Sequence, residues 1–220
     1  MSIGDVVQVA LIWHPSGVVS SFLPGRSLLG LDYATFRSSA AFLRFKVIPE
    51  LDMLIYGAKQ MAESWRTVRK NTVQIAEDIP ADKYGFQATP DTMSVMQILA
   101  HMATSTHWAE QLHFVDKKSD VTGPDFGRYM GEGGAIAATL TSKDLIVDAL
   151  ITRGEGFALQ LEAMADAQLD AIVTLPGGSK SRFEMLLGIK EHEMHHRAQL
   201  MVIERMLGIV PHLTRARQSR

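Results

Sequence analysis

The sequence predicts an all-α protein: a four-helix bundle preceded by an N-terminal extension. Three observations predict this class. From residue 53 onward, apolar residues recur three and four positions apart in four segments, which is the period of amphipathic helices. Proline, glycine and helix-capping residues separate these segments. No part of the chain is clearly rich in strand patterns, and four amphipathic helices bury their apolar faces most simply against one another.

The composition excludes several classes of protein. The chain has 220 residues, 46% of them hydrophobic, a net charge of -2 and an isoelectric point of about 6.4. Without a basic field, neither nucleic acid nor an anionic membrane is an expected partner. No apolar run approaches the roughly 20 residues of a membrane-spanning helix, and the N-terminus lacks the basic start of a signal peptide. A cytoplasmic protein is expected.

Charge density and periodicity predict three regions: an extension over residues 1–52, the bundle over 53–207 and a tail over 208–220. The extension has few charges and no sustained helical period. Within it, Val6–Trp13 is compatible with a short strand and Ser38–Val47 with a short helix. An alternative is that residues 1–52 are upstream sequence read in frame, with Met53 as the natural start. The short basic end of the tail, Arg215–Arg220, is expected to fray.

The first two helices are predicted from their apolar faces. The first ends at Ile79-Pro80, and its face is Leu54, Ala58, Met61, Trp65, Val68, Thr72 and Ile75. After a linker, the second opens at Asp91 or Thr92, both suitable N-caps, and ends near Phe114. Its face is Val95, Ile98, His101, Ser105, Trp108 and Leu112.

A glycine-rich connection over residues 115–141 separates the second and third helices. A connection of this length is functional, mobile or contains a short helix, and it is expected to shape a substrate pocket. The third helix starts near Thr141 and carries the face Ile146, Leu150, Phe157, Leu161 and Met164. The fourth follows a turn at 176–178, begins with the capping pair Ser181 and Glu184, and ends near Leu207.

Three histidines occupy positions where an apolar residue is expected. On the fourth helix, His192 and His196 fill the gap between Ile189 and Leu200, one turn apart on one face. His101 fills the same kind of position on the second helix. Two neighbouring buried imidazoles are costly unless they have partners, and one divalent ion serves both. The alternative is a pair of hydrogen-bonded core histidines without a metal.

Three inward imidazoles from two helices would form a site with open positions for water or substrate. Imidazole suits Zn, Ni, Fe or Cu, and the sequence does not choose among them. The other five histidines are out of phase with the apolar faces or lie outside the helices, so surface or structural roles are expected for them: His14, His107, His113, His195 and His212.

Residues 192–196 also match the H-E-x-x-H motif of metalloproteases, with Glu193 as the general base. The extended form of the motif needs Gly at 199 and His at 202, where this chain has Gln199 and Val202. No acidic ligand follows on a later helix. The metalloprotease is therefore the less favoured alternative, and Glu193, 100° away from the ligand direction, is expected to be solvated or to orient a ligand.

The stretches IPADKYGFQATPDTMSVMQILAHM (79–102) and KEHEMHHRAQL (190–200) resemble the DinB superfamily, whose members are four-helix bundles with a metal site. The resemblance covers residues 53–207 and implies His101, His192 and His196 as ligands of a divalent metal. Arg197 and Gln199 also match, whereas Ala198 stands where the family more often has Gly. The resemblance further implies a homodimer and, in characterised relatives, transferase or isomerase chemistry with low-molecular-weight thiols.

The expected function is that of a metal-dependent transferase or hydrolase acting on small molecules, with Zn, Ni or Fe as the metal. A metal-bound thiol or water would be the nucleophile, and because the chain has no cysteine, any thiol must come from a cosubstrate. The alternative is a non-catalytic metal-binding or stress-related protein, so the assignment as an enzyme stays open. No catalytic residue is identified beyond two weak candidates, Glu193 and Gln97, the latter one turn before His101.

Overall fold

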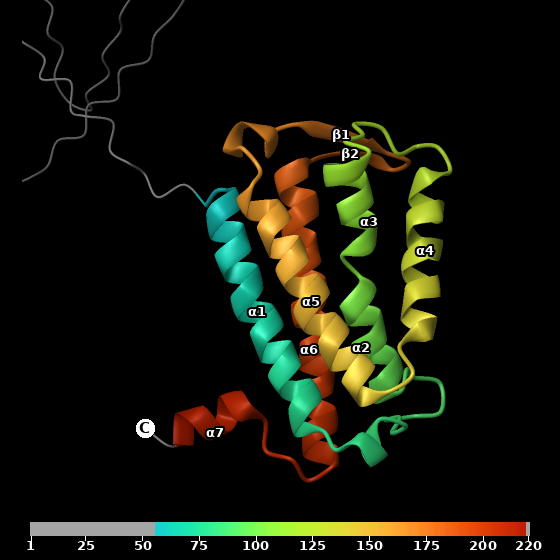
Figure 1. The fold of residues 1–220 in the computed structure, drawn as a ribbon, viewed down its shortest axis with the longest axis vertical. Coiled ribbons are helices and arrows are strands. Elements are labelled where there is room, and N and C mark those ends of the chain that lie inside the picture. The colour runs from blue at the N-terminus through green and yellow to red at the C-terminus, as the bar shows by residue number, and fades with distance from the viewer. Residues whose placement is uncertain (1–55, 219–220) are drawn as a thin grey trace, which may run out of the picture. The chain divides into compact units, whose positions relative to one another are not determined.

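A computed structural model describes residues 56–218, and the predictions made for the N-terminal extension lie outside these residues. Four helical segments form the bundle (Figure 1): α1 and α2 each pack against both α5 and α6. The bounds are Ala58–Asp78 for α1, Val95–Thr104 for α2, Lys143–Glu162 for α5 and Arg182–Met206 for α6. The second segment continues past α2 through a short α3, His107–Ala109, and a π-helical turn, Glu110–Val115. The predicted helical bundle is thus confirmed.

The caps explain where the helices begin. The hydroxyl of Ser94, and not Asp91 or Thr92, caps α2 by accepting a hydrogen bond from the Gln97 N–H. The Thr92 hydroxyl is instead used in the preceding turn, where it donates to the Thr89 carbonyl. Ser142 caps α5, and Ser181 caps α6 as predicted, accepting from the Glu184 N–H.

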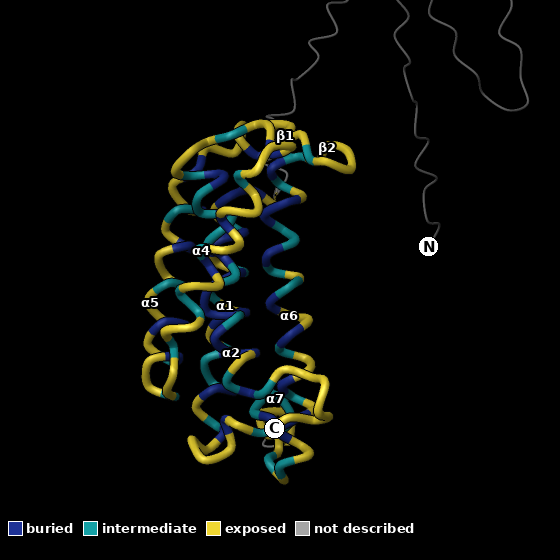
Figure 2. The backbone as a smooth tube through the Cα atoms, turned by 90° about the vertical axis from the view of Figure 1, so that its right-hand side faces the viewer, coloured by how far each residue is buried: buried dark blue, intermediate teal, exposed yellow. Residues whose placement is uncertain are grey.

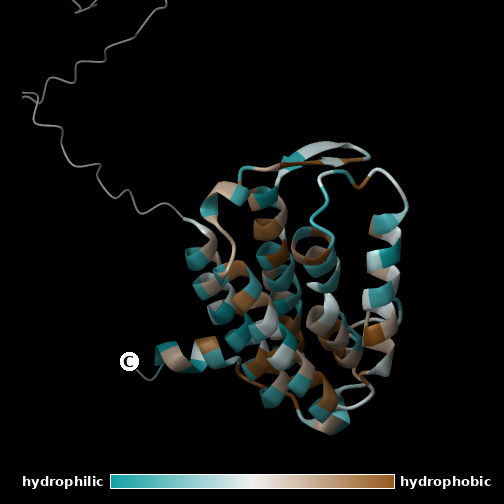
Figure 3. Ribbon diagram, turned by 45° about the horizontal axis from the view of Figure 1, so that its top comes forward, coloured by the Kyte–Doolittle hydropathy of each residue, from teal (hydrophilic) through white to brown (hydrophobic). Residues whose placement is uncertain are grey.

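The connection between α2 and α5 contains a helix that periodicity did not reveal, α4 (Asp125–Thr139), which packs beside α2 and α3. Hydropathy colouring shows few strongly apolar residues on it (Figure 3), and only Tyr129 and Gly133 of α4 are buried. Gly133 lies next to the end of α2, where a Cβ would be in ordinary van der Waals contact with the Thr104 carbonyl oxygen, at 3.5 Å. Because α4 packs against its neighbours along one narrow strip of its surface, its sequence has too weak an apolar pattern to predict a helix.

Two short strands join α5 to α6, where the sequence predicted only a turn. Strands β1 (Ile172–Leu175) and β2 (Gly178–Ser181) pair antiparallel, with Leu175 opposite Gly178. Gly178 has a φ of 144°, a conformation that favours glycine. The hairpin closes one end of the bundle (Figure 1) and pairs through Thr174 with the segment that precedes α4.

The C-terminal tail is also more ordered than predicted. It forms α7 (His212–Gln218), which is attached to α1 by two polar contacts. Arg215 pairs with Asp78 at 2.6 Å, and the imidazole of His212 lies 3.1 Å from the Asn71 side-chain oxygen. These partners are distant in sequence, so no local pattern predicts them.

The buried positions follow the inner sides of the helices (Figure 2) and form two large apolar clusters along the bundle and a third, smaller one that includes Val173 of β1 and Tyr129 of α4. Of the two large clusters, one contains Ile75, Leu99, Leu150 and Leu200, and the other contains Trp65, Phe157 and Ile189. None of the helices within residues 56–218 is long and apolar enough to cross a membrane.

Candidate metal centre

A buried polar layer separates the two large apolar clusters of the bundle. On α6, Glu193 and His196 lie between Ile189 of one cluster and Leu200 of the other. On α1, Arg69 and Thr72 occupy the same level. Buried polar side chains are costly unless their hydrogen bonds are satisfied, so this layer is where a functional site is expected.

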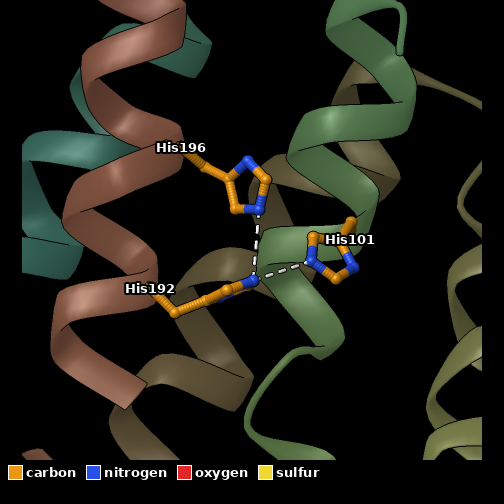
Figure 4. A group of neighbouring side chains, drawn as sticks. All are labelled: His101, His192 and His196. Atoms are coloured by element: carbon orange, nitrogen blue, oxygen red, sulfur yellow. Dashed lines mark hydrogen bonds between the residues drawn. The ribbon is translucent and has the colours of Figure 1, made fainter. Parts of the chain in front are cut away.

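The three predicted histidines meet in this layer (Figure 4). The Nε2 atom of His192 lies 3.0 Å from Nε2 of His101 and 3.1 Å from Nε2 of His196. All three ligand atoms fall within 4.8 Å of one another, and these side chains are half-buried or buried. The structure therefore brings together the residues that helical periodicity selected from two separate helices.

Hydrogen bonding fixes the tautomer of His196. The side-chain oxygen of Gln199 lies 2.8 Å from its Nδ1, while the Gln199 amide nitrogen faces the ring of His195 at 3.2 Å. With the amide in this orientation, Nδ1 of His196 donates, and its Nε2 presents a lone pair toward His192. Gln199 thus orients the imidazole in the way that helps metal ligation.

Without a metal, the imidazole protons cannot form a full hydrogen bond at each of the contacts between the three rings. Nε2 of a neutral imidazole carries either one proton or one lone pair. The Nε2 of His192 faces two other Nε2 atoms, so a single proton there must be shared between the two contacts. A divalent cation accepts all three lone pairs. Two nitrogens at about 2.0–2.1 Å from a tetrahedral ion are about 3.3 Å apart, close to the two separations observed.

The surroundings of the cluster favour neutral imidazoles, the form that binds metal. Burial, together with the smaller effects of the neighbouring His196 and His101, lowers the pKa of His192 to about 4. Burial also lowers the pKa of His101, with His196 as the second cause. At neutral pH these two rings are therefore uncharged.

A cavity of about 280 Å³ opens beside His101 and His192. Its walls come from α2, α3, α4 and α6, and α4 alone contributes six of the lining residues: Phe126, Tyr129, Met130, Gly133, Gly134 and Ala137. The expectation that the 115–141 connection shapes a pocket fits this arrangement. The volume lies just below the range of about 300–1,000 Å³ typical of small-molecule sites.

Glu193 does not face this cavity, contrary to both the general-base and the solvated interpretations. Its carboxylate is completely buried and pairs with Arg69 of α1, with Nε–Oε1 and Nη2–Oε2 separations of 3.0 and 3.1 Å. Arg69 also donates to the Met102 carbonyl at 3.0 Å and stacks over the Trp65 ring. The carboxylate is therefore committed to a structural ion pair, which removes the base that the metalloprotease alternative requires.

Gln97, the other weak catalytic candidate, is exposed and does not line the cavity. Its side-chain oxygen accepts a hydrogen bond of 2.8 Å from the Ser94 N–H, completing the capping box of α2. The position one turn before His101 is correct, but the side chain reaches back to the helix start.

Four of the other histidines can be placed. His107 contacts Glu132 of α4 at 3.0 Å, His195 is exposed beside Gln199, and His212 contacts Asn71. His113 is fully packed, and burial, with a smaller contribution from Arg182, lowers its pKa to about 3. Each has a surface or structural environment, as expected, and His14 lies outside the described residues.

Four packed helices with three converging imidazoles beside an apolar cavity define a helical-bundle protein with a candidate metal centre. The chain belongs to the DinB superfamily: the sequence model of that superfamily matches residues 64–200. The matched range contains His101, His192 and His196.

A relative and a solved structure agree with this membership. The uncharacterized protein YjoA of Bacillus subtilis (strain 168) is 26% identical over 157 residues, which are 69% of this chain and 91% of YjoA. The crystal structure of a DinB-like protein, YjoA from Bacillus subtilis, is similar with a TM-score of 0.53 at 24% identity, covering 68% of this chain and 92% of that one. The structural likeness supports the fold.

Proposed function

We propose that this protein is a metal-dependent enzyme that acts on small molecules, with transferase or hydrolase chemistry. The observation that carries the proposal is the convergence of three Nε2 atoms next to a cavity of small-molecule size. The imidazoles of His101, His192 and His196 would hold one Zn, Ni or Fe ion, and the ion would lower the pKa of a thiol or water.

Other residues of the chain would orient the metal ligands and hold the helices that carry them. Gln199 holds the ring of His196 in the ligating tautomer, and the Arg69–Glu193 pair fixes α6 against α1 next to the cluster. α4 covers the cavity and reduces the access of water. Because the chain has no cysteine, a thiol nucleophile would be supplied by a cosubstrate.

Metal analysis of the purified chain tests the site. We expect about one equivalent of divalent metal in the wild type and its loss in the variants His101→Ala, His192→Ala and His196→Ala. His212→Ala is the control, because His212 is a histidine of α7 that contacts Asn71 and no residue of the cluster, and it should keep its metal. Full metal content in all three ligand variants would refute the proposal.

Activity measurements then separate the reaction classes. Metal-loaded protein incubated with electrophiles should consume them faster with an external thiol if it is a transferase, and without one if it is a hydrolase. Turnover of neither kind across a broad panel, in protein that retains its metal, would favour the non-catalytic metal-binding alternative.

A further inference from the structure

The cavity beside the histidines has an apolar wall. Among the side chains that line it are those of Trp108, Phe126, Met130 and Ile189. Trp108 and Phe126 meet edge to face, with ring centroids 5.5 Å apart, so one corner of the cavity is aromatic. Within the described part of the chain, no Lys, Arg, Asp or Glu lines this cavity.

Apart from the two histidines, the polar side chains of the wall already donate their hydrogen bonds to other residues. The Thr104 hydroxyl donates to the Ala100 carbonyl at 3.1 Å, and the Ser105 hydroxyl donates to the Met102 carbonyl at 3.1 Å. The Tyr129 hydroxyl donates to Asp116 at 2.5 Å. The oxygens of these three hydroxyls can still accept a hydrogen bond from a ligand, but they have no further proton to donate. A carboxylate or phosphate held against the wall away from the histidines would find neither a cation nor a free hydroxyl donor.

Building on the proposed function, we propose that this site takes an uncharged, mainly apolar molecule of one or two rings. Its single reacting polar group faces the histidines, and its body lies against the aromatic wall. Compounds that carry a second, anionic group deep in the cavity are rejected, because burying an unpaired charge costs more than the apolar contact returns.

Two glycines leave the space that such a molecule needs. Gly188 lies one helical turn before His192 on α6, and Gly134 lies on α4 across the cavity. A Cβ at either position meets no described atom within 4 Å. A larger side chain there would extend into the cavity without displacing its neighbours, so both glycines set the size of the ligand.

A matched pair of probes tests the charge selectivity: benzyl mercaptan and 4-(mercaptomethyl)benzoate. They share the thiol and the ring and differ in one carboxylate. Binding is measured by titration calorimetry on chelator-treated protein and on Co²⁺-loaded protein, whose visible spectrum reports the metal centre independently. We expect benzyl mercaptan to bind at least tenfold more tightly than the carboxylate probe in both forms.

The outcomes separate the two proposals. Equal or tighter binding of the carboxylate probe, or no binding of benzyl mercaptan, overturns the ligand class. Absence of a Co²⁺ spectrum with the tenfold selectivity preserved overturns the metal-dependent function and leaves the ligand class standing.

Cavity-filling variants test the role of the glycines. Gly188→Leu should weaken benzyl mercaptan binding at least tenfold and keep the Co²⁺ spectrum. Gly156→Leu is the matched control, because Gly156 is an exposed helical glycine with equal free space and no part in the cavity. Gly134→Leu repeats the test from the opposite wall if the first variant does not fold. Unchanged affinity in a folded variant contradicts the size-setting role.

Discussion

The buried pair of Arg69 and Glu193 gives the sharpest test of how this bundle is built. Replacing Glu193 with Gln keeps the size and shape of the side chain and removes one charge. If Glu193 were a general base, the variant would lose activity and keep its stability. If the carboxylate serves to neutralise Arg69, the variant will lose stability.

The expected cost follows from the burial of both groups. Arg69 is 4% exposed and Glu193 is completely buried. Unit charges about 4 Å apart at an effective dielectric constant of about 20 attract by about 4 kcal/mol. Removing one partner of a buried pair costs about 3–5 kcal/mol, because the other charge is left uncompensated. For a chain of this size, that corresponds to a fall in Tm of about 6–20 °C.

Urea denaturation followed by far-ultraviolet circular dichroism measures the loss, with metal content determined on the same preparations. Glu191→Gln is the control, since Glu191 is an exposed glutamate on the same helix, and it should change stability by less than about 0.5 kcal/mol. The double variant Arg69→Met with Glu193→Met should recover most of the loss, since apolar side chains often replace a buried ion pair without cost. A Glu193→Gln protein as stable as the wild type would refute the reasoning.

Three further predictions concern other polar positions of the bundle. Burial raises the pKa of Glu204 from 4.5 to about 7, so the unfolding free energy should fall as pH rises from about 4.5 to 7, by about 3 kcal/mol at most, and Glu204→Gln should flatten that dependence in denaturation curves. Gly154→Ala should destabilise the protein by about 1–3 kcal/mol, because the new Cβ would lie 2.7 Å from Cγ of Arg69, whereas Gly156→Ala should stabilise it by up to about 1 kcal/mol. Gln199→Ala should weaken metal affinity about 10–100-fold in a competition titration, because it frees a cluster imidazole to change tautomer.

Periodicity was sufficient for the bundle helices and for the three histidines, because a polar residue in an apolar stripe is a local signal. It was insufficient for α4, where Tyr129 and Gly133 are the buried residues, and for α7, whose attachment depends on Asp78 more than a hundred residues earlier. Contacts between residues so far apart in sequence leave no trace in a local window.

The sequence did indicate that Glu193 is buried, but its position in the H-E-x-x-H motif suggested a catalytic role instead. Glu193 follows Ile189 by four residues and precedes Leu200 by seven, so it lies on the buried stripe as much as His196 does. An acidic residue in that phase needs a buried cation. Arg69, one residue after the apolar Val68, was the cation to look for on α1.

The motif and the structure disagree because adjacent helical residues point about 100° apart. In the linear motif, Glu193 directly follows a ligand and suggests a base beside the metal. In the bundle, His192 faces the cavity while Glu193 faces α1, where Arg69 holds it. One turn of α6 therefore has two roles. Its imidazoles contribute to the candidate metal centre, and the carboxylate of Glu193 neutralises the buried charge of Arg69 next to that centre. In the proposed reaction, the proton acceptor would be the substrate or water, because no Asp or Glu among the described residues lines the cavity.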